Sequence, residues 1–327
     1  MNRRELLLAT GALLGTKLVW AQSGKAPYRI GLLVSLDAVG WFVAAMKDRD
    51  WVQGRDYLLV KSRTPFTAGN AQDAAKHIVA ENPDLIVVGP TAFALAAHRQ
   101  TSTIPIVMWV SGYPVEAGLA NSLRKPGKNV TGNSIYAGTG VWGKMVQILK
   151  EAKPATKRVG VLWGYAPPAF LREEIDPGQQ EIRNAASTLG LATQLTEISK
   201  PEDALASIAQ LARDGADALI IAGRTPLGAY REKAVELCVA KRLPVIVDAR
   251  WPVSEEPYPL FAYGAVLDDL MRQATTYVVQ ILKGARAGDL PIQQPSKVEL
   301  VVNLKFARAI GLPIPQSLLI RANWVIE

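Results

Sequence analysis

Six short, continuous apolar runs recur along the chain and limit its fold more than any other feature of the sequence. They read RIGLLV, DLIVVG, IPIVMWV, VGVLWG, ALIIAG and LPVIVD. Strands that are apolar on both sides belong to parallel sheets whose two faces are covered by helices. Amphipathic helical stretches separate the runs, and this alternation predicts an α/β fold with doubly wound sheets.

The alternation occurs twice, so the chain of 327 residues is expected to form two lobes. The first set spans residues 28–134, and the second begins at KRVGVLWGY and ends near Ala262. A further amphipathic stretch, LDDLMRQATTYVVQILKG, then precedes the alternating strand KVELVVN. A helix that follows a completed second set indicates that the chain crosses between the lobes more than once.

The first 21 residues differ in kind from the rest of the chain. Arg3 and Arg4 precede an apolar stretch, and Val19 and Ala21 form the pair of small residues typical of a secretory cleavage site. We therefore expect residues 1–21 to be a signal peptide, cleaved after Ala21, and the protein to be periplasmic. The arginine pair leaves twin-arginine export open beside the general route. The structural alternative is a buried first helix.

Charge and composition exclude several classes of function. The net charge is +8, and removal of the leader would leave about +6, with acidic residues interspersed as in REEIDPGQQEIR. No basic stripe carries interleaved aromatic residues, so nucleic acid is not an expected partner. Two histidines and one cysteine offer almost no transition-metal ligands, so no metal site is expected. Cys238 is interpreted as a buried helix residue rather than a nucleophile.

The segment AGTGVWGKMVQ contains Gly138, Gly140 and Gly143 in the spacing of a dinucleotide-binding turn. Such a turn needs a later strand that ends in an acidic residue, but the next strand ends in Trp163-Gly164-Tyr165. We interpret the segment as the connection into the second lobe and the start of its first helix. No cofactor is expected. The chain also lacks the G-x-S-x-G, P-loop and H-E-x-x-H motifs, so no catalytic residue is assigned.

Candidate ligand-binding residues follow the predicted strands, because ligands of open parallel sheets bind at the carboxyl ends of the strands. Small or hydroxylated residues at expected helix starts suit a carboxylate, since free backbone N–H groups gather there. This group comprises Ser35, Thr91, Ala92, Ser111 with Gly112, and Thr225. For Thr91 and Thr225, a purely structural role as helix caps is the competing interpretation.

Aromatic and charged residues gather after the same strands. Tyr113, Tyr165 and Tyr263 are expected to follow strand ends and to line a pocket, whereas Trp109 and Trp163 lie inside apolar runs and are expected in the core. Arg224 and Asp248 are the charged groups best placed for a ligand carboxylate and a ligand ammonium, respectively. For both, a surface or interlobe ion pair is the competing interpretation.

The chain resembles the ABC transporter substrate-binding proteins of the tryptophan/tyrosine-binding-like group. The most specific segments are TSTIPIV, PVEAGLANSLRKPGKNVTG and the long tail DLPIQQPSKVELVVNLKFARAIGLPIPQSLLIRANWVIE. The resemblance implies a type I periplasmic-binding fold, with two Rossmann-like lobes joined by a hinge of several crossings. The chain departs from the family's pattern at several positions where a ligand would bind. Tyr113 stands where the family has an acidic residue, Gly164-Tyr165-Ala166 replaces an asparagine-rich turn, and the segment after Ser35 is short.

From this resemblance we expect an N-terminal lobe of residues 27–134 plus 265–290 and a C-terminal lobe of residues 135–264 plus 295–327. Hinge segments are expected at residues 131–135, 261–264 and 291–295. The implied protein is a monomer that closes on a small amino-acid-like or aromatic, carboxylate-bearing solute and delivers it to an ABC permease in the inner membrane. Two alternatives remain open: a sensory subunit that docks to a signalling receptor, and an exported enzyme on the same fold.

The leader interpretation predicts the first residue of the mature protein. When the full chain is expressed in a Gram-negative host and recovered from the periplasm, its N-terminus should be Gln22, because Val19 and Ala21 fit the cleavage site. Intact-mass spectrometry checks this. Recovery of a chain that still begins at Met1 would favour the buried-helix alternative.

Overall fold

A computed structural model describes residues 26–63, 70–136, 140–164, 177–198, 200, 202–222, 227, 230–250 and 258–327. The predicted signal peptide and three of the candidate site residues, Tyr165, Arg224 and Thr225, lie outside these ranges. Among the described residues, no helix is both long enough and apolar enough to cross a membrane.

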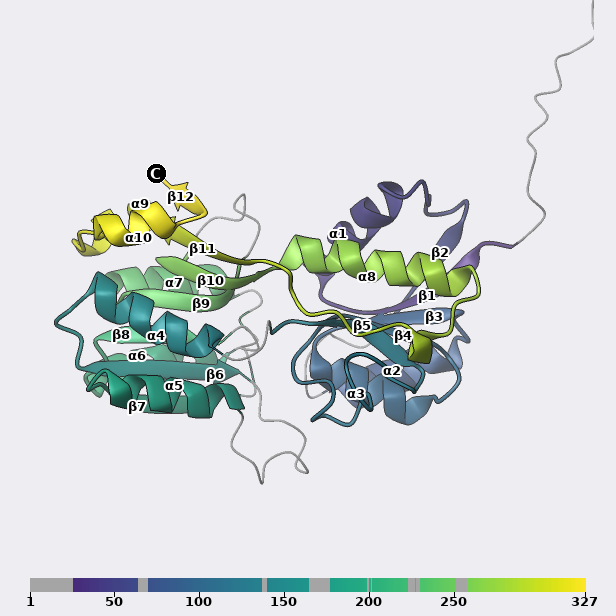
Figure 1. Ribbon diagram of the computed structural model, residues 1–327, viewed down its shortest axis with the longest axis horizontal. Coiled ribbons are helices and arrows are strands. Elements are labelled where there is room, and N and C mark those ends of the chain that lie inside the picture. The colour runs from purple at the N-terminus through teal and green to yellow at the C-terminus, as the bar shows by residue number, and fades with distance from the viewer. Residues whose placement is uncertain are drawn as a thin grey trace, which may run out of the picture.

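The described strands form two separate sheets (Figure 1). In the first sheet all neighbouring strands are parallel, in the order β2-β1-β3-β4-β5. Every residue of β3 and β4 is buried, as their continuous apolar runs predict. The bounds are β1 (Tyr28–Leu33), β2 (Tyr57–Lys61), β3 (Leu85–Val88), β4 (Ile106–Ser111) and β5 (Val130–Ser134).

Helices cover both faces of the first sheet, and one of them comes from late in the chain. The helices α1 (Leu36–Lys47) and α8 (Leu267–Leu282) pack on one face, and α2 (Ala71–Ala80) and α3 (Thr91–Gln100) pack on the other. The short helix η4 (Ala287–Asp289) follows α8. We call this sheet with these helices the first lobe. The expectation that the late helix returns to it is confirmed.

The second sheet has the order β12-β11-β10-β9-β8-β6-β7. Its neighbours are parallel except for β10 and β11, which are antiparallel. The bounds are β6 (Arg158–Gly164), β7 (Ala192–Ile198), β8 (Ala218–Ile221), β9 (Val245–Arg250), β10 (Phe261–Val266), β11 (Val298–Asn303) and β12 (Trp324–Ile326).

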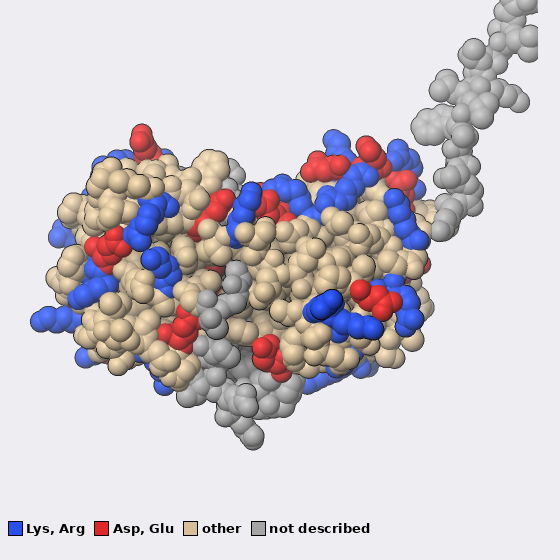
Figure 2. All heavy atoms as spheres, viewed as in Figure 1, with Lys and Arg blue, Asp and Glu red and all other residues tan. Residues whose placement is uncertain are grey.

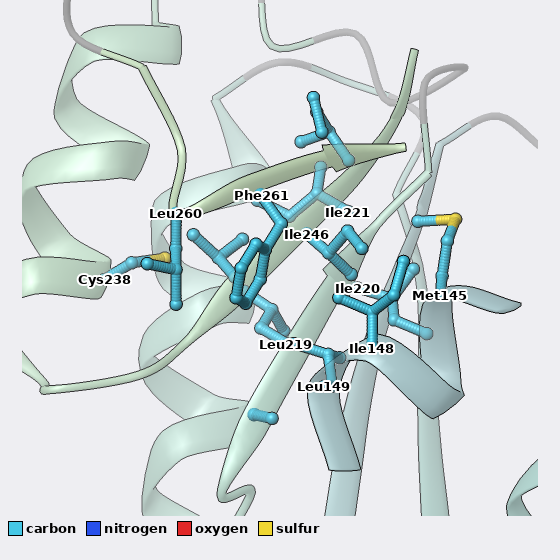
Figure 3. Packing of buried hydrophobic residues seen from close by; sticks show 14 of the residues in the cluster. Met145, Ile148, Leu149, Leu219, Ile220, Ile221, Cys238, Ile246, Leu260 and Phe261 are labelled. Carbon is cyan, nitrogen blue, oxygen red and sulfur yellow. The ribbon is translucent and has the colours of Figure 1, made fainter. Parts of the chain in front are cut away.

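The helices that accompany this sheet complete what we call the second lobe. They are α4 (Val141–Ala152), α5 (Pro177–Thr188), α6 (Asp203–Arg213), α7 (Arg231–Ala240), α9 (Leu304–Ile310) and α10 (Gln316–Arg321). Figure 3 shows side chains of β8, β9 and β10 packed between α4 and α7. Trp163, expected in the core, is 1% exposed.

The chain passes between the lobes three times (Figure 1). The first crossing leaves the end of β5 for α4, the second leaves the end of β10 for α8, and the third runs from η4 to β11. Since β5 is parallel to the other strands of its sheet and β10 is parallel to β9, β8, β6 and β7, both sheets direct carboxyl ends of their strands toward the crossings. The two sets of carboxyl ends therefore face each other.

The glycine-rich segment lies at the first crossing. Gly140, with φ +107°, precedes α4, and Gly143 lies in the first turn of that helix. Gly138 is outside the described residues. The interpretation of the segment as the entry into the second lobe and the start of its first helix is confirmed.

Cys238 is completely buried on α7, and burial raises the pKa of its thiol to about 12. Because the unfolded state loses the thiol proton first, the free energy of unfolding should fall as pH rises from about 9 toward about 12. At about pH 10 the loss from this group should be about 1.4 kcal/mol. Urea denaturation at pH 8 and pH 10 should therefore show a larger alkaline loss for the parent protein than for Cys238→Ala. Equal losses would contradict the burial effect.

Candidate functional site

The end of β4 is held in a specific conformation by the hydroxyl of Thr91. Thr91 Oγ1 donates a hydrogen bond to the backbone oxygen of Gly112 at 3.1 Å, and it accepts bonds from Gly112 N at 2.9 Å and Ser111 Oγ at 3.1 Å. These bonds use the donor and both acceptor positions of the hydroxyl. Thr91 therefore joins the start of α3 to the end of β4. It does not act as a helix cap.

Tyr113 follows directly and has an unusual backbone. Its φ is +48°, a left-handed conformation that costs a non-glycine residue about 1 kcal/mol or more. Its carbonyl accepts a bond from Ala117 N at 2.9 Å, and Leu119 N bonds to Pro114 O at 2.9 Å. These turns occupy the position at which we expected Ser111 and Gly112 to open a helix, so that expectation was wrong. Proline at residue 114 and Gly118, with φ +72°, favour turns there.

An aromatic run, which we define as Tyr113, Tyr136, Trp142 and Trp163, connects the two lobes. The ring centroids of Tyr113 and Tyr136 are 4.8 Å apart, those of Tyr136 and Trp142 5.6 Å, and those of Trp142 and Trp163 4.8 Å. The run thus leads from the end of β4 through the first crossing to α4 and β6. Tyr113 is half-buried, and the other three rings are at most 5% exposed.

The start of α5 packs directly on the two tryptophans. A Cβ atom at Gly178 would lie 2.6 Å from Trp142 Nε1 and 2.8 Å from Trp163 Cη2, so only glycine fits here without rearrangement. Two side chains of α5 attach this helix to its neighbours, one through a backbone group and one through a side chain. Glu181 Oε1 accepts a bond from Gly143 N at 2.9 Å, and Gln179 Nε2 donates to Glu197 Oε1 at 2.9 Å.

A second aromatic pair lies at the carboxyl end of the first sheet. Trp109 is 6% exposed and packs edge to face with the half-buried Trp41 of α1, with centroids 5.9 Å apart. The indole of Trp109 lies against Gly89 at the end of β3, where a Cβ atom would be 2.4 Å from Nε1. Trp109 is therefore a core residue, as expected.

The N-termini of α1 and α3 present backbone N–H groups at this same end of the sheet. Ser35 is half-buried before α1, and neither Ser35 nor Pro90 caps its helix through a side chain. Ala92, in the first turn of α3, is 8% exposed. The partial positive charge of both helix starts favours an acceptor or an anion.

The remaining candidates lie in the second sheet. Asp248 lies inside β9, not after a strand end as we expected, because the pairing of β9 with β10 continues to Arg250. It is 2% exposed, an environment in which a carboxylate requires a cation or hydrogen-bond donors. Tyr263 lies inside β10, not after a strand end as we expected, because the pairing of β10 with β9 continues to Val266. The pKa of the half-buried Tyr263 is raised, because the effect of burial exceeds the opposing effect of the nearby charge of Arg321.

The structure therefore brings together some of the expected residues and not others. Thr91, Ala92, Gly112 and Tyr113 lie close together at the ends of β3 and β4, whereas Asp248 and Tyr263 belong to the other lobe. Sequence reasoning missed Trp41, Tyr136 and Trp142. For Tyr136 and Trp142 a signal existed, since Tyr136 directly precedes the glycine-rich segment and Trp142 lies within it, between Gly140 and Gly143. Within the described ranges, no three His, Cys, Asp or Glu side chains lie together as a metal site requires.

Comparison with known proteins gives one family and one fold. A family model described as ABC transporter substrate binding protein matches residues 35–326. A tyrosine-binding protein of Clostridioides difficile (strain R20291) is 23% identical over 273 residues, which cover 83% of this chain and 75% of that protein.

Two solved structures are similar over nearly their whole length. One is an ABC domain in complex with L-Trp from Streptococcus pneumonia, with a TM-score of 0.78, 22% identity, and coverage of 92% of this chain and 100% of that one. The other is a conserved domain protein from Vibrio cholerae O1 biovar El Tor, with a TM-score of 0.79, 24% identity, and coverage of 92% and 99%. These likenesses establish the type I periplasmic-binding fold.

The hydrogen bonds of Thr91 predict a stability difference between two substitutions. Thr91→Val keeps the side-chain shape but leaves the buried polar groups of Ser111 and Gly112 without their shared partner, which should cost about 1–3 kcal/mol. Thr91→Ser retains the hydroxyl and serves as the control. Urea denaturation of both variants measures the difference. A valine variant as stable as the serine variant would contradict this account of the β4 end.

Proposed function

The chain belongs to the family of ABC transporter substrate binding proteins, and we propose that it is the exported solute receptor of an importer. In this proposal the protein closes on a small amino-acid-like or aromatic, carboxylate-bearing ligand between its lobes. It then releases the ligand unchanged to an ABC permease in the inner membrane. The receptor acts in the periplasm as a monomer, without a cofactor.

One observation carries the proposal: carboxyl strand ends of both sheets face each other across three crossings. In open α/β sheets these ends are where ligands bind. A ligand held there contacts both lobes at once, so binding favours the closed arrangement by the difference in its affinity for the two states. The surface between the lobes is hollowed along its upper edge in Figure 2.

The chemistry of the first lobe supports an aromatic amino acid as ligand. Tyr113 provides an aromatic face, and tilted or offset ring contacts contribute about 0.5–1.5 kcal/mol beyond the burial of their area. The helix starts at Ser35 and at Thr91 with Ala92 supply N–H groups for a carboxylate. Gly112, whose own N–H donates to Thr91 Oγ1, is assigned to the wall beside them. The tyrosine-binding and L-Trp-bound relatives support the same ligand class.

The second lobe supplies the opposite wall in this proposal. Asp248 is assigned to the ligand ammonium, Arg224 and Thr225 to a carboxylate, and Tyr165 and Tyr263 to the apolar part of the ligand. The proposed lobes comprise residues 27–134 plus 265–290 and residues 135–264 plus 295–327. Closure is proposed to bend the hinge segments at residues 131–135, 261–264 and 291–295.

Two other functions fit the same fold. A sensory subunit would bind the same ligand but dock to a signalling receptor instead of a permease, and co-purification from membranes with either partner distinguishes the two. An enzyme would alter the ligand. Incubation with L-tryptophan followed by mass spectrometry tests for turnover, and recovery of unchanged L-tryptophan favours a receptor.

Binding of L-tryptophan and L-tyrosine to residues 22–327 tests the proposal. At about one hundred times the dissociation constant, either ligand should stabilise the protein by about 2.7 kcal/mol, which a thermal-shift assay detects. Small-angle scattering of the same samples should show compaction. Absence of binding by every aromatic amino acid and small carboxylate tried would refute the proposed ligand class.

Tyr113→Ala should weaken binding roughly tenfold or more, because it removes an aromatic wall of the site. Tyr28→Ala is the matched control. Tyr28 is also half-buried and packs on an aromatic ring, that of Trp51, but it lies at the amino end of β1, remote from the crossings. Isothermal titration calorimetry should show parent-like affinity for the control. Equal affinities in the two variants would show that the site has been misplaced.

A further inference from the structure

One fully buried residue, Asn133 of β5, connects the end of β4 to α8 and to the third crossing. Its side-chain Nδ2 donates to the backbone oxygen of Trp109 at 3.2 Å and to that of Leu270, in the first turn of α8, at 2.7 Å. Its backbone forms a parallel bridge with Gln293 of the third crossing. A residue near the end of β5 thus holds the first-lobe ends of the second and third crossings.

The third crossing is attached to β5 by further bonds around Asn133. Ser134 N donates to Gln293 O at 2.7 Å, and Gln293 N donates to Gly132 O at 2.9 Å. Thr131 Oγ1 donates to Leu290 O at 2.8 Å. All of these bonds join the third crossing to a strand of the first lobe.

The contact with Trp109 lies at an irregularity of the first sheet. The register between β4 and β5 shifts between Met108 and Ser111, so the carbonyl of Trp109 is not part of a regular ladder. The amide of Asn133 supplies that carbonyl with a donor, two residues before the Ser111–Gly112 backbone held by Thr91. Asn133 therefore supports the candidate ligand wall as well as the crossings.

The oxygen of the same amide indicates that the two bonds donated by Nδ2 are important. Asn133 Oδ1 is buried and has no hydrogen-bond partner in the described structure. An unpartnered buried oxygen costs free energy that an apolar side chain of similar size would avoid. The two bonds donated by Nδ2 must outweigh that cost.

We propose that Asn133 is a positioning residue for ligand binding, which locks the first-lobe ends of all three crossings to the first lobe. The inference rests on the proposed receptor function. On this assignment, the rotation that opens the lobes takes place on the second-lobe side of the lock. Ile135 still belongs to the first-lobe side, because its N–H donates to Ser111 O of β4 at 2.8 Å. The described positions on the second-lobe side are Tyr136 in the first crossing, the register shift between Ala262 and Ala265 before the second, and Gln294 to Lys297 in the third.

The bonds between the third crossing and β5 end at Gln293. The next residue bonds to the first crossing instead, because Gln294 Nε2 donates to Tyr136 O at 3.3 Å. Beyond it, a small crevice lies between the first turns of α8 and the third crossing, lined by Val266, Asp269, Leu270, Gln273, Pro295, Ser296 and Lys297. Ser296 and Lys297 are exposed.

Asn133→Asp tests the lock, because it preserves the side-chain shape but replaces the donor with a group that repels two carbonyl oxygens. The matched control is Asn303→Asp in the second lobe. Asn303 is also buried and donates through Nδ2 to a backbone oxygen, that of Tyr258, at 2.8 Å, but it lies at the far end of β11. The acceptor role of its Oδ1 toward Phe306 N survives the substitution.

The first measurement needs no ligand. In amide hydrogen exchange followed by NMR, Asn133→Asp should accelerate exchange at Ser134 and Gln293 by roughly tenfold or more relative to Asn303→Asp. The amide of Ile106, bonded to Asn129 O at the opposite end of the β4–β5 pair, should be equally protected in both variants. Equal exchange at Ser134 and Gln293 in the two variants would refute the attachment of the crossings to the first lobe by Asn133.

The second measurement uses L-tryptophan as the probe. Asn133→Asp should weaken its binding roughly tenfold and reduce the compaction seen by scattering, whereas Asn303→Asp should retain the parent values. Parent-like affinity in Asn133→Asp, together with accelerated exchange, would overturn the role in ligand binding. If the parent protein itself binds no aromatic amino acid, the proposed function fails. The exchange experiment still shows whether Asn133 attaches the crossings to the first lobe.

If Asn133→Asp does not fold, Thr131→Val provides a milder variant, since it removes only the bond to Leu290 O. Exchange at Gln293 should then accelerate severalfold, with Ile106 unchanged. Unchanged exchange at Gln293 would overturn the attachment of the third crossing to the first lobe.

Discussion

Parallel pairing at two particular strands makes the carboxyl ends of the two sheets face each other. β5 and β10 each pair in parallel with a neighbour, and each leaves its sheet at the carboxyl end for the other lobe. Had either strand been reversed, its crossing would have started from the opposite edge, and the two sets of carboxyl ends would not face each other. The helix starts of α1 and α3 lie on one side of this arrangement, Asp248 belongs to the sheet on the other, and the aromatic run leads from one lobe to the other.

The candidate site depends on side-chain groups whose hydrogen bonds are made within the protein. The amide of Asn133 bonds to Trp109 and the hydroxyl of Thr91 bonds to Gly112, and Tyr113, in a left-handed conformation, follows directly. Gly178 has a similar supporting role in the second lobe, because the absence of a side chain lets α5 pack on Trp142 and Trp163. These residues fix the positions of the backbone and the aromatic rings around them, and the geometry of the candidate site depends on those positions.

The sequence predicted the fold well, because strands buried on both faces leave a continuous apolar run. All six runs are strands, namely β1, β3, β4, β6, β8 and β9. Strands β2 and β7 gave no such signal, since Tyr57–Lys61 and Ala192–Ile198 contain exposed positions and polar residues. The position of Tyr263 inside β10 was missed because the sequence alone does not show how far β9 and β10 pair. The aromatic run joins four different elements, so no local pattern could reveal its contacts.

The return of α8 to the first lobe also affects how the polypeptide acquires its structure during synthesis. Leu270, Ala274 and Val278 share a buried cluster with Phe42 and Val107, so one side of the first sheet is covered by α1 alone until the ribosome has translated most of the message. Domains otherwise tend to fold in the order in which they emerge. Here the half that is made first is completed only after most of the half that follows it, and the nascent chain retains a partly covered apolar sheet for most of its elongation.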